Sequence, residues 1–238
     1  MALDTAKADT AFFQKVLFVA SQDTAAPAPY VKWASAARKK YPRSSYFLGE
    51  LVRAYGYAGE VDNLVAATKE LVAVDTTDMQ PVLRAVIALN GAKRYTEAVD
   101  LGSYIERYGQ AVDKRNLGSI LAQGGLDVLR IQPIDFRLAE AIGRKAVGFL
   151  GTAGRAAQLA NYVLAIGLMG QIQAKYLAVQ ESKACEPIDA LEKIIAETKA
   201  AFVAGRDIQP AFIDERIPML DNYAPTVAQM RKLYCKAK

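Results

Sequence analysis

Apolar side chains recur every three or four positions along almost the whole chain, a spacing typical of amphipathic helices. Alanine is abundant, and short stretches with polar residues, glycine or proline separate the periodic segments. Strict alternation of apolar and polar positions, which would predict strands, is nearly absent. The pattern predicts helices at about 9–21, 28–41, 44–57, 61–74, 79–91, 95–108, 114–130, 135–149, 153–180, 187–204, 209–220 and 224–236. We therefore expect an all-α protein.

The predicted helices share a second pattern, in which three apolar or small residues are spaced four and then three positions apart. Four helices contain it: Tyr30, Ala34 and Ala37; Leu64, Thr68 and Leu71; Ala98, Gly102 and Ile105; and Ala139, Gly143 and Ala146. Most of the middle positions carry small side chains, which allow neighbouring helices to approach closely. The pattern predicts that these positions are buried where consecutive helices pack as antiparallel pairs.

The segment 45–75 resembles a tetratricopeptide repeat, a helix–turn–helix unit of 34 residues. Counted from Ser45, Gly59 falls in the tight turn of that family, and the next repeat begins at Met79. The run Tyr95-Thr96-Glu97-Ala98 resembles the family's turn into its second helix. The resemblance covers residues 28–150 and is clearest over 45–108, with departures from the family pattern at Val52 and Thr76.

The resemblance implies a right-handed superhelical array of antiparallel helix pairs in residues 1–150. Residues 151–238 are then a C-terminal helical cap, packed on the repeats as part of one continuous domain. In this family the first helices of the repeats line a concave groove that binds an extended segment of a protein or peptide partner. The resemblance therefore implies a non-catalytic binding scaffold.

Transferred to this chain, the groove positions of the family are Tyr46, Arg53, Tyr57, Gln80, Arg84, Ile87 and Asn90. Arginine guanidinium groups bind carboxylates, and tyrosines offer flat contact area at a low entropic cost. The alternative is that the tyrosines pack against the helices and the arginines are merely solvated. The lysines and asparagines with which some members hold a free C-terminal carboxylate are not reproduced here.

Residues 156–180 form one long predicted helix that is apolar around much of its circumference. Such a helix must be covered by other helices or by a partner. It supplies the alternative function, a helical protein that binds a small ligand in a pocket beneath 156–180. A closed apolar cavity would favour that alternative, and an open polar groove would favour the scaffold.

The 238-residue chain contains no histidine. This composition excludes Ser-His-Asp and Cys-His catalysis and imidazole metal sites. The carboxylates are scattered at helical spacings, which favours solvated faces and ion pairs, and no nucleophile has a recognisable activating base. We expect no enzymatic activity, no cofactor and no metal.

The net charge is +5, with basic residues concentrated at 38–43 and 231–238. Basic residues near helix C-termini complement the helix dipole, and no extended stripe of basic residues interleaved with aromatic ones accompanies the charge. We therefore expect no nucleic-acid partner. The longest apolar stretch, Leu159–Gly170, is shorter than the ~20 residues that span a bilayer, so we expect no membrane span.

Cys185 and Cys235 are the only cysteines, and they do not form a C-x-x-C motif. We favour a disulfide between them, which would hold the last helix against the tenth, over two buried thiols in a cytoplasmic protein. The Ala-, Thr- and Asp-rich start resembles the segment that follows a removed leader. These two features predict a periplasmic or secreted bacterial protein, with a cytoplasmic one as the alternative.

Overall fold

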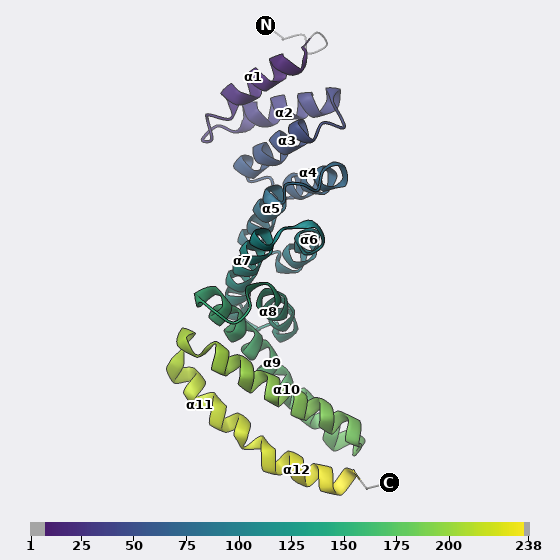
Figure 1. The fold of residues 1–238 in the computed structure, drawn as a ribbon, viewed down its shortest axis with the longest axis vertical. Coiled ribbons are helices and arrows are strands. Elements are labelled where there is room, and N and C mark those ends of the chain that lie inside the picture. The colour runs from purple at the N-terminus through teal and green to yellow at the C-terminus, as the bar shows by residue number, and fades with distance from the viewer. Residues whose placement is uncertain (1–7, 236–238) are drawn as a thin grey trace. The chain divides into compact units, whose positions relative to one another are not determined.

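The computed structural model describes residues 8–235, and all regular secondary structure in that range is helical. It comprises α1 (Thr10–Ala20), α2 (Ala28–Lys40), α3 (Ser45–Ala58), α4 (Val61–Val74), α5 (Gln80–Gly91), α6 (Tyr95–Tyr108), α7 (Ala111–Arg130), α8 (Phe136–Leu150), α9 (Arg155–Ser182), α10 (Cys185–Ala204), the 3₁₀-helix η1 (Arg206–Ile208), α11 (Pro210–Asp221) and α12 (Tyr223–Tyr234) (Figure 1). The predicted all-α class is therefore confirmed. Residues 1–7, on which the expectation of a removed leader rests, lie outside the described residues.

The helix ends agree closely with the pattern of apolar positions. The largest difference within the described residues is at α7, which is predicted to begin at 114 and begins at Ala111. Local chemistry explains several ends. The Asp9 carboxylate accepts a hydrogen bond from the Phe12 amide at the start of α1 (2.8 Å). Gly59 ends α3 with a φ of 69°, a conformation that favours glycine.

The chain forms two compact units, one ending at Asp113 and the other beginning at Lys114. This boundary lies within the first turn of α7. The family resemblance instead divides the chain at residue 150, where the repeats end and the cap begins. That division is based on the type of helix pair and not on the compactness of the units. The division into repeats at 1–150 and a cap at 151–238 remains a prediction.

In the first unit, each helix from α1 to α5 packs against the next one along the chain, and α3 also packs against α5. The predicted pattern residues of α2, α4 and α6 are all buried. Thr68, the one polar residue among them, donates its hydroxyl to the Leu64 carbonyl (2.7 Å). The pattern thus predicts correctly which residues of these helices lie in the core.

In the second unit, α9 packs against both α8 and α10. Glycines permit a very close approach of α8 and α9: a Cβ atom on Gly143 would lie 2.6 Å from backbone atoms of Leu164. A Cβ atom on Gly167 would lie even closer to the backbone nitrogen of Glu140. The predicted positions Ala139, Gly143 and Ala146 are all buried at this packing face.

Helix α9 is the one helix among residues 8–235 that is long and apolar enough to cross a membrane, by length and composition alone. The mean hydropathy of its most apolar window is 1.2, and 44% of that window is buried inside the protein. Its residues from Asn161 to Leu168 are buried without interruption. Its contacts with α8 and α10 account for this apolar character as that of a core helix.

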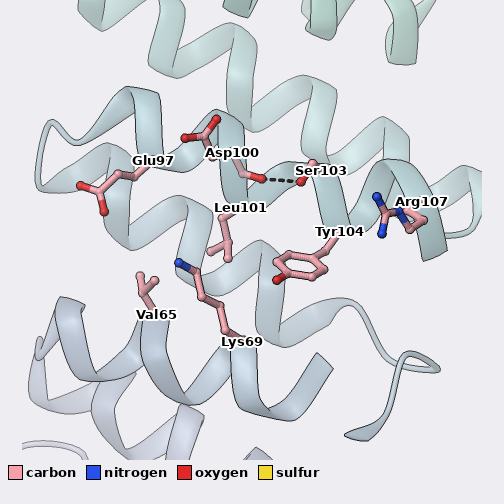
Figure 2. Close-up of a pocket in the computed structure, with 8 residues that line it drawn as sticks. All are labelled: Val65, Lys69, Glu97, Asp100, Leu101, Ser103, Tyr104 and Arg107. Carbon is pink, nitrogen blue, oxygen red and sulfur yellow. Dashed lines mark hydrogen bonds between the residues drawn. The ribbon is translucent and has the colours of Figure 1, made fainter. Parts of the chain in front are cut away.

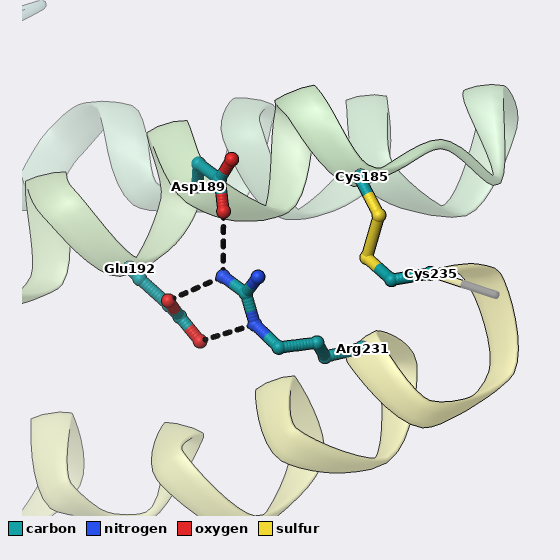
Figure 3. The surroundings of a disulfide bond; sticks show 5 residues. All are labelled: Cys185, Asp189, Glu192, Arg231 and Cys235. Carbon is teal, nitrogen blue, oxygen red and sulfur yellow. Dashed lines mark hydrogen bonds and ion pairs between the residues drawn. A yellow bond between two sulfur atoms is a disulfide. The ribbon is translucent and has the colours of Figure 1, made fainter. Parts of the chain in front are cut away.

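The end of the second unit is held by a disulfide. Cys185, at the start of α10, is bonded to Cys235, which follows α12, and their Cα atoms are 5.3 Å apart (Figure 3). One turn before Cys235, the Arg231 guanidinium donates to Asp189 and Glu192 of α10, each at 2.6 Å. The predicted disulfide is therefore confirmed, and the alternative of two free thiols is wrong.

Candidate functional site

A pocket of about 320 Å³ lies between α3 and α5 in the first unit. Four of the predicted groove residues line it: Tyr46 and Arg53 from α3, and Gln80 and Arg84 from α5. The other lining residues are Ser45, Gly49, Glu50, Leu71, Asp75, Asp78 and Pro81. The pocket is open to solvent and most of its lining residues are polar or charged, which is the kind of groove expected of the scaffold.

The remaining predicted residues do not line this pocket. Tyr57 lies one helical turn beyond Arg53, and Ile87 lies one turn beyond Arg84. Both are well exposed, at 47% and 54% of their surface. Asn90 is half-buried at the end of α5. The structure therefore brings four of the seven residues together and places Tyr57 and Ile87 farther along the same two helices.

A buried carboxylate that the sequence pattern did not single out supports the α3 side of the pocket. Glu50 is only 7% exposed and accepts a hydrogen bond from the Tyr30 hydroxyl of α2 (2.6 Å). Its other oxygen lies 3.3 Å from the Arg53 guanidinium. Burial and the interaction with Glu50 raise the pKa of Tyr30 well above its ordinary value. Arg53 is thus held to the wall by a buried charge rather than solvated freely.

The two predicted tyrosines are neither fully packed nor fully free. Tyr46 is 46% exposed and its ring meets that of Phe47 edge to face, with centroids 5.2 Å apart. Partial burial, with a smaller contribution from the Glu50 charge, raises the pKa of Tyr46. The Tyr57 ring lies 6.1 Å from the Tyr30 ring. Each tyrosine is therefore positioned by an aromatic neighbour and still offers about half of its surface to a ligand.

Two acidic residues at the other end of the pocket are engaged in local turns. Asp75 accepts hydrogen bonds from both the hydroxyl and the amide of Thr77 (2.6 and 2.9 Å). These bonds lower the pKa of the Asp75 carboxyl. The Asp78 carboxylate accepts a hydrogen bond from the backbone amide of Gln80 at the start of α5 (2.9 Å). Both carboxylates thus organise the connection between α4 and α5.

A second hollow of about 320 Å³ lies between α4 and α6 (Figure 2). Val65 and Lys69 of α4 face Glu97, Asp100, Leu101, Ser103, Tyr104 and Arg107 of α6. Its charges are mixed, and Glu97 already pairs with Arg94 (2.6 Å). The Ser103 hydroxyl donates to the Asp100 carbonyl of its own helix (2.6 Å). No acid–base pair with a nucleophile is assembled among these eight residues.

The surroundings of α9 bear on the small-ligand alternative. A hollow of about 500 Å³ lies beside α9 and is lined in part by Phe136, Arg137, Gly170 and Lys175, but it is open to solvent. The interface between α8 and α9 is filled by the glycine contacts already described. Within residues 8–235 there is also no cluster of three or more His, Cys, Asp or Glu side chains that could hold a metal ion.

These observations define the class of the molecule as an all-α protein in which helices adjacent in sequence pack together and one disulfide closes the C-terminal end. A comparison with models of protein families finds no match to this chain, and a comparison with curated proteins finds no significant relative. Function must therefore be argued from the groove itself.

Proposed function

We propose that the protein is a non-catalytic scaffold that binds an extended segment of a protein or peptide partner along α3 and α5. The observation that carries the proposal is that Tyr46, Arg53, Gln80 and Arg84 line one open pocket together. Tyrosine and arginine dominate the binding energy of many protein interfaces, because they combine large contact area with strong hydrogen bonds.

The proposal includes a tetratricopeptide-like arrangement of the helix pairs. Its support is the register of the pairs: α4 begins at Val61 and α6 at Tyr95, 34 residues apart, the length of one such repeat. The buried triplets of α4 and α6 occupy equivalent positions in that register. Gly59 also forms the turn in which the resemblance places it.

The small-ligand alternative has less support. A ligand buried beneath α9 would need space between α9 and its neighbours, but Gly143 and Gly167 place the α8 and α9 backbones in direct contact. The hollow beside Phe136 lies at the surface and does not enclose a ligand. The open polar groove of the first unit matches the scaffold better.

We also propose that the protein functions in an oxidising compartment, as a periplasmic or secreted protein does. The support is the disulfide between Cys185 and Cys235, since such bonds persist outside the reducing cytoplasm. The exposed position of Cys185 would make the bond accessible to cytoplasmic reductants.

The test is affinity capture of a partner from native extract, followed by a binding measurement with the purified partner. The double variant Tyr46→Ala, Arg84→Ala removes two exposed groove side chains without touching the Glu50 interactions. We expect about 30-fold weaker binding, equivalent to about 2 kcal/mol. The matched control is Arg107→Ala, Tyr108→Ala, an exposed Arg–Tyr pair on α6.

Unchanged affinity in the groove variant, or an equal loss in the α6 control, would refute the groove as the binding site. Circular dichroism and thermal melting of both variants would verify that each is folded. The basic surface at 38–43 would then be the next one to test.

A further inference from the structure

Among the described residues, Arg84 lines the pocket without a carboxylate partner, unlike three other arginines of the first unit. Arg38 pairs with Glu70, Arg53 with Glu50, and Arg94 with Glu97 and Asp62. Arg84 is exposed on the pocket wall and makes no ion pair with any residue in the range 8–235. Its full charge and all of its donors are therefore available to a ligand.

The carboxylates nearest to Arg84 in the pocket have other roles. Asp75 and Asp78 accept hydrogen bonds in the α4–α5 connection, and Glu50 is buried against Tyr30 and Arg53. Arg53 is accordingly a weaker anion site than Arg84, since the buried Glu50 already balances its charge. We therefore assign the two arginines different roles in the groove.

The groove changes character along its length. The pocket is lined by residues from the stretch Ser45–Arg53 of α3 and the stretch Gln80–Arg84 of α5, which fits two helices that run in the same direction. Tyr57 and Ile87 therefore both lie toward the C-terminal end, one turn beyond the two arginines. Both expose large apolar surface there. On α5, the charged Arg84 is followed by the apolar Ile87 about 4.5 Å farther along the helix axis, because three residues of an α-helix rise by that distance.

We propose that the groove recognises an extended segment in which a side-chain carboxylate and a large apolar side chain lie within two residues of each other. This inference rests on the proposed scaffold function. Arg84 binds the carboxylate through charge-assisted hydrogen bonds, and Tyr57 and Ile87 contact the apolar side chain. Two residues of an extended peptide span about 6.6 Å. This span matches the ~4.5 Å rise from the charged to the apolar position of the groove once the length of the arginine side chain is included.

The charge balance favours a carboxylate over a phosphate group. A phosphate carries close to two negative charges and is bound best by two or more free cations. The pocket has one unpaired guanidinium, Arg84, and also contains the carboxylates Asp75 and Asp78. These would repel a dianion more strongly than a monoanion. A single carboxylate is therefore the matching ligand group.

Selection from a random seven-residue peptide library against the full-length protein tests this inference. Such peptides extend for about 23 Å, longer than the roughly 16 Å from Tyr46 to Tyr57 along α3. We expect the enriched peptides to contain Asp or Glu within two positions of Leu, Ile, Phe, Tyr or Met. A selected peptide in which the acidic residue is replaced by its amide should bind at least tenfold more weakly to the wild-type protein.

The Arg84→Gln variant makes the test specific. On this variant the amide replacement in the peptide should change affinity less than twofold, because the partner of the carboxylate is gone. Arg53→Gln and the control Arg107→Gln should both retain the preference for the acidic peptide. Enrichment without acidic residues, or an acidic preference that survives Arg84→Gln, would overturn the inference.

The failure of the underlying scaffold proposal gives a different result. If no peptide is enriched, or if enriched peptides bind equally well to Tyr46→Ala, Arg84→Gln and Ile87→Ser variants, the groove is not the binding site. If Tyr46→Ala and Ile87→Ser weaken binding but the acidic preference is absent, the groove binds peptides and only the proposed chemistry of the ligand is wrong.

Discussion

The close packing of α8 on α9 makes a sharp prediction for a single methyl group. In Gly143→Ala the new Cβ atom would lie 2.6 Å from the backbone nitrogen and Cα of Leu164 and 2.8 Å from its Cβ. Ordinary van der Waals contacts of a Cβ atom are at 3.4–4 Å, so the helices must separate by about 1 Å. The obstructing atoms belong mainly to the backbone and cannot rotate away as a flexible side chain can.

Two opposing terms determine the size of the effect. Overpacking a buried contact costs about 1–3 kcal/mol, and a contact with backbone atoms belongs at the upper end of that range. Alanine gains about 1 kcal/mol over glycine in a helix interior. We therefore expect Gly143→Ala to lower the free energy of unfolding of the second unit by about 2 kcal/mol.

Gly148 provides a matched control on the same helix. It is exposed, and a Cβ atom there would meet nothing within 4 Å. Gly148→Ala should therefore stabilise the protein by up to about 1 kcal/mol through helix propensity alone. Urea unfolding followed by circular dichroism measures both changes, and hydrogen exchange of the α8 and α9 amides locates them. Equal or greater stability of Gly143→Ala relative to the wild type would refute the close approach of these helices.

Three further changes test other contacts. Replacing both Cys185 and Cys235 by serine should destabilise the second unit by about 4 kcal/mol in the chain-entropy model for a separation of 50 residues, measured against the oxidised protein by urea unfolding. Tyr30→Phe should cost about 1–3 kcal/mol because it removes the buried donor to Glu50, and wild-type stability in that variant would contradict the hydrogen bond. Since the folded state raises the pKa of Tyr30, the wild-type protein should lose stability as the pH rises above about 10, where the unfolded tyrosine ionises, and Tyr30→Phe should lose less. Gly102→Leu should lower the free energy of unfolding by about 1–3 kcal/mol because it overpacks the buried face of α6. The shift in melting temperature of this variant can be compared with that of the exposed substitution Ser103→Leu.

The candidate site was only partly predictable from the sequence. Tyr46, Arg53, Gln80 and Arg84 were placed in one groove by the family resemblance, and they do line one pocket. Glu50 was missed, since on a helical pattern its spacing is that of an ordinary solvated carboxylate. Its burial depends on Tyr30, 20 residues earlier in the chain. Arg53 has a carboxylate partner and Arg84 has none within the part of the chain that the structure describes. This difference depends on the same buried Glu50, so no local sequence pattern predicts it.

The spacing of residues along the chain is enough to predict the helices and their buried faces. Both depend on interactions within three or four residues, such as the apolar spacing of Leu64, Thr68 and Leu71, and on local end signals such as Gly59. The packing of the folded helices determines which distant groups meet. It brought Glu50 to Tyr30 and the Gly143 backbone to that of Leu164, because such contacts depend on how whole helices pack and leave no periodic trace in the chain.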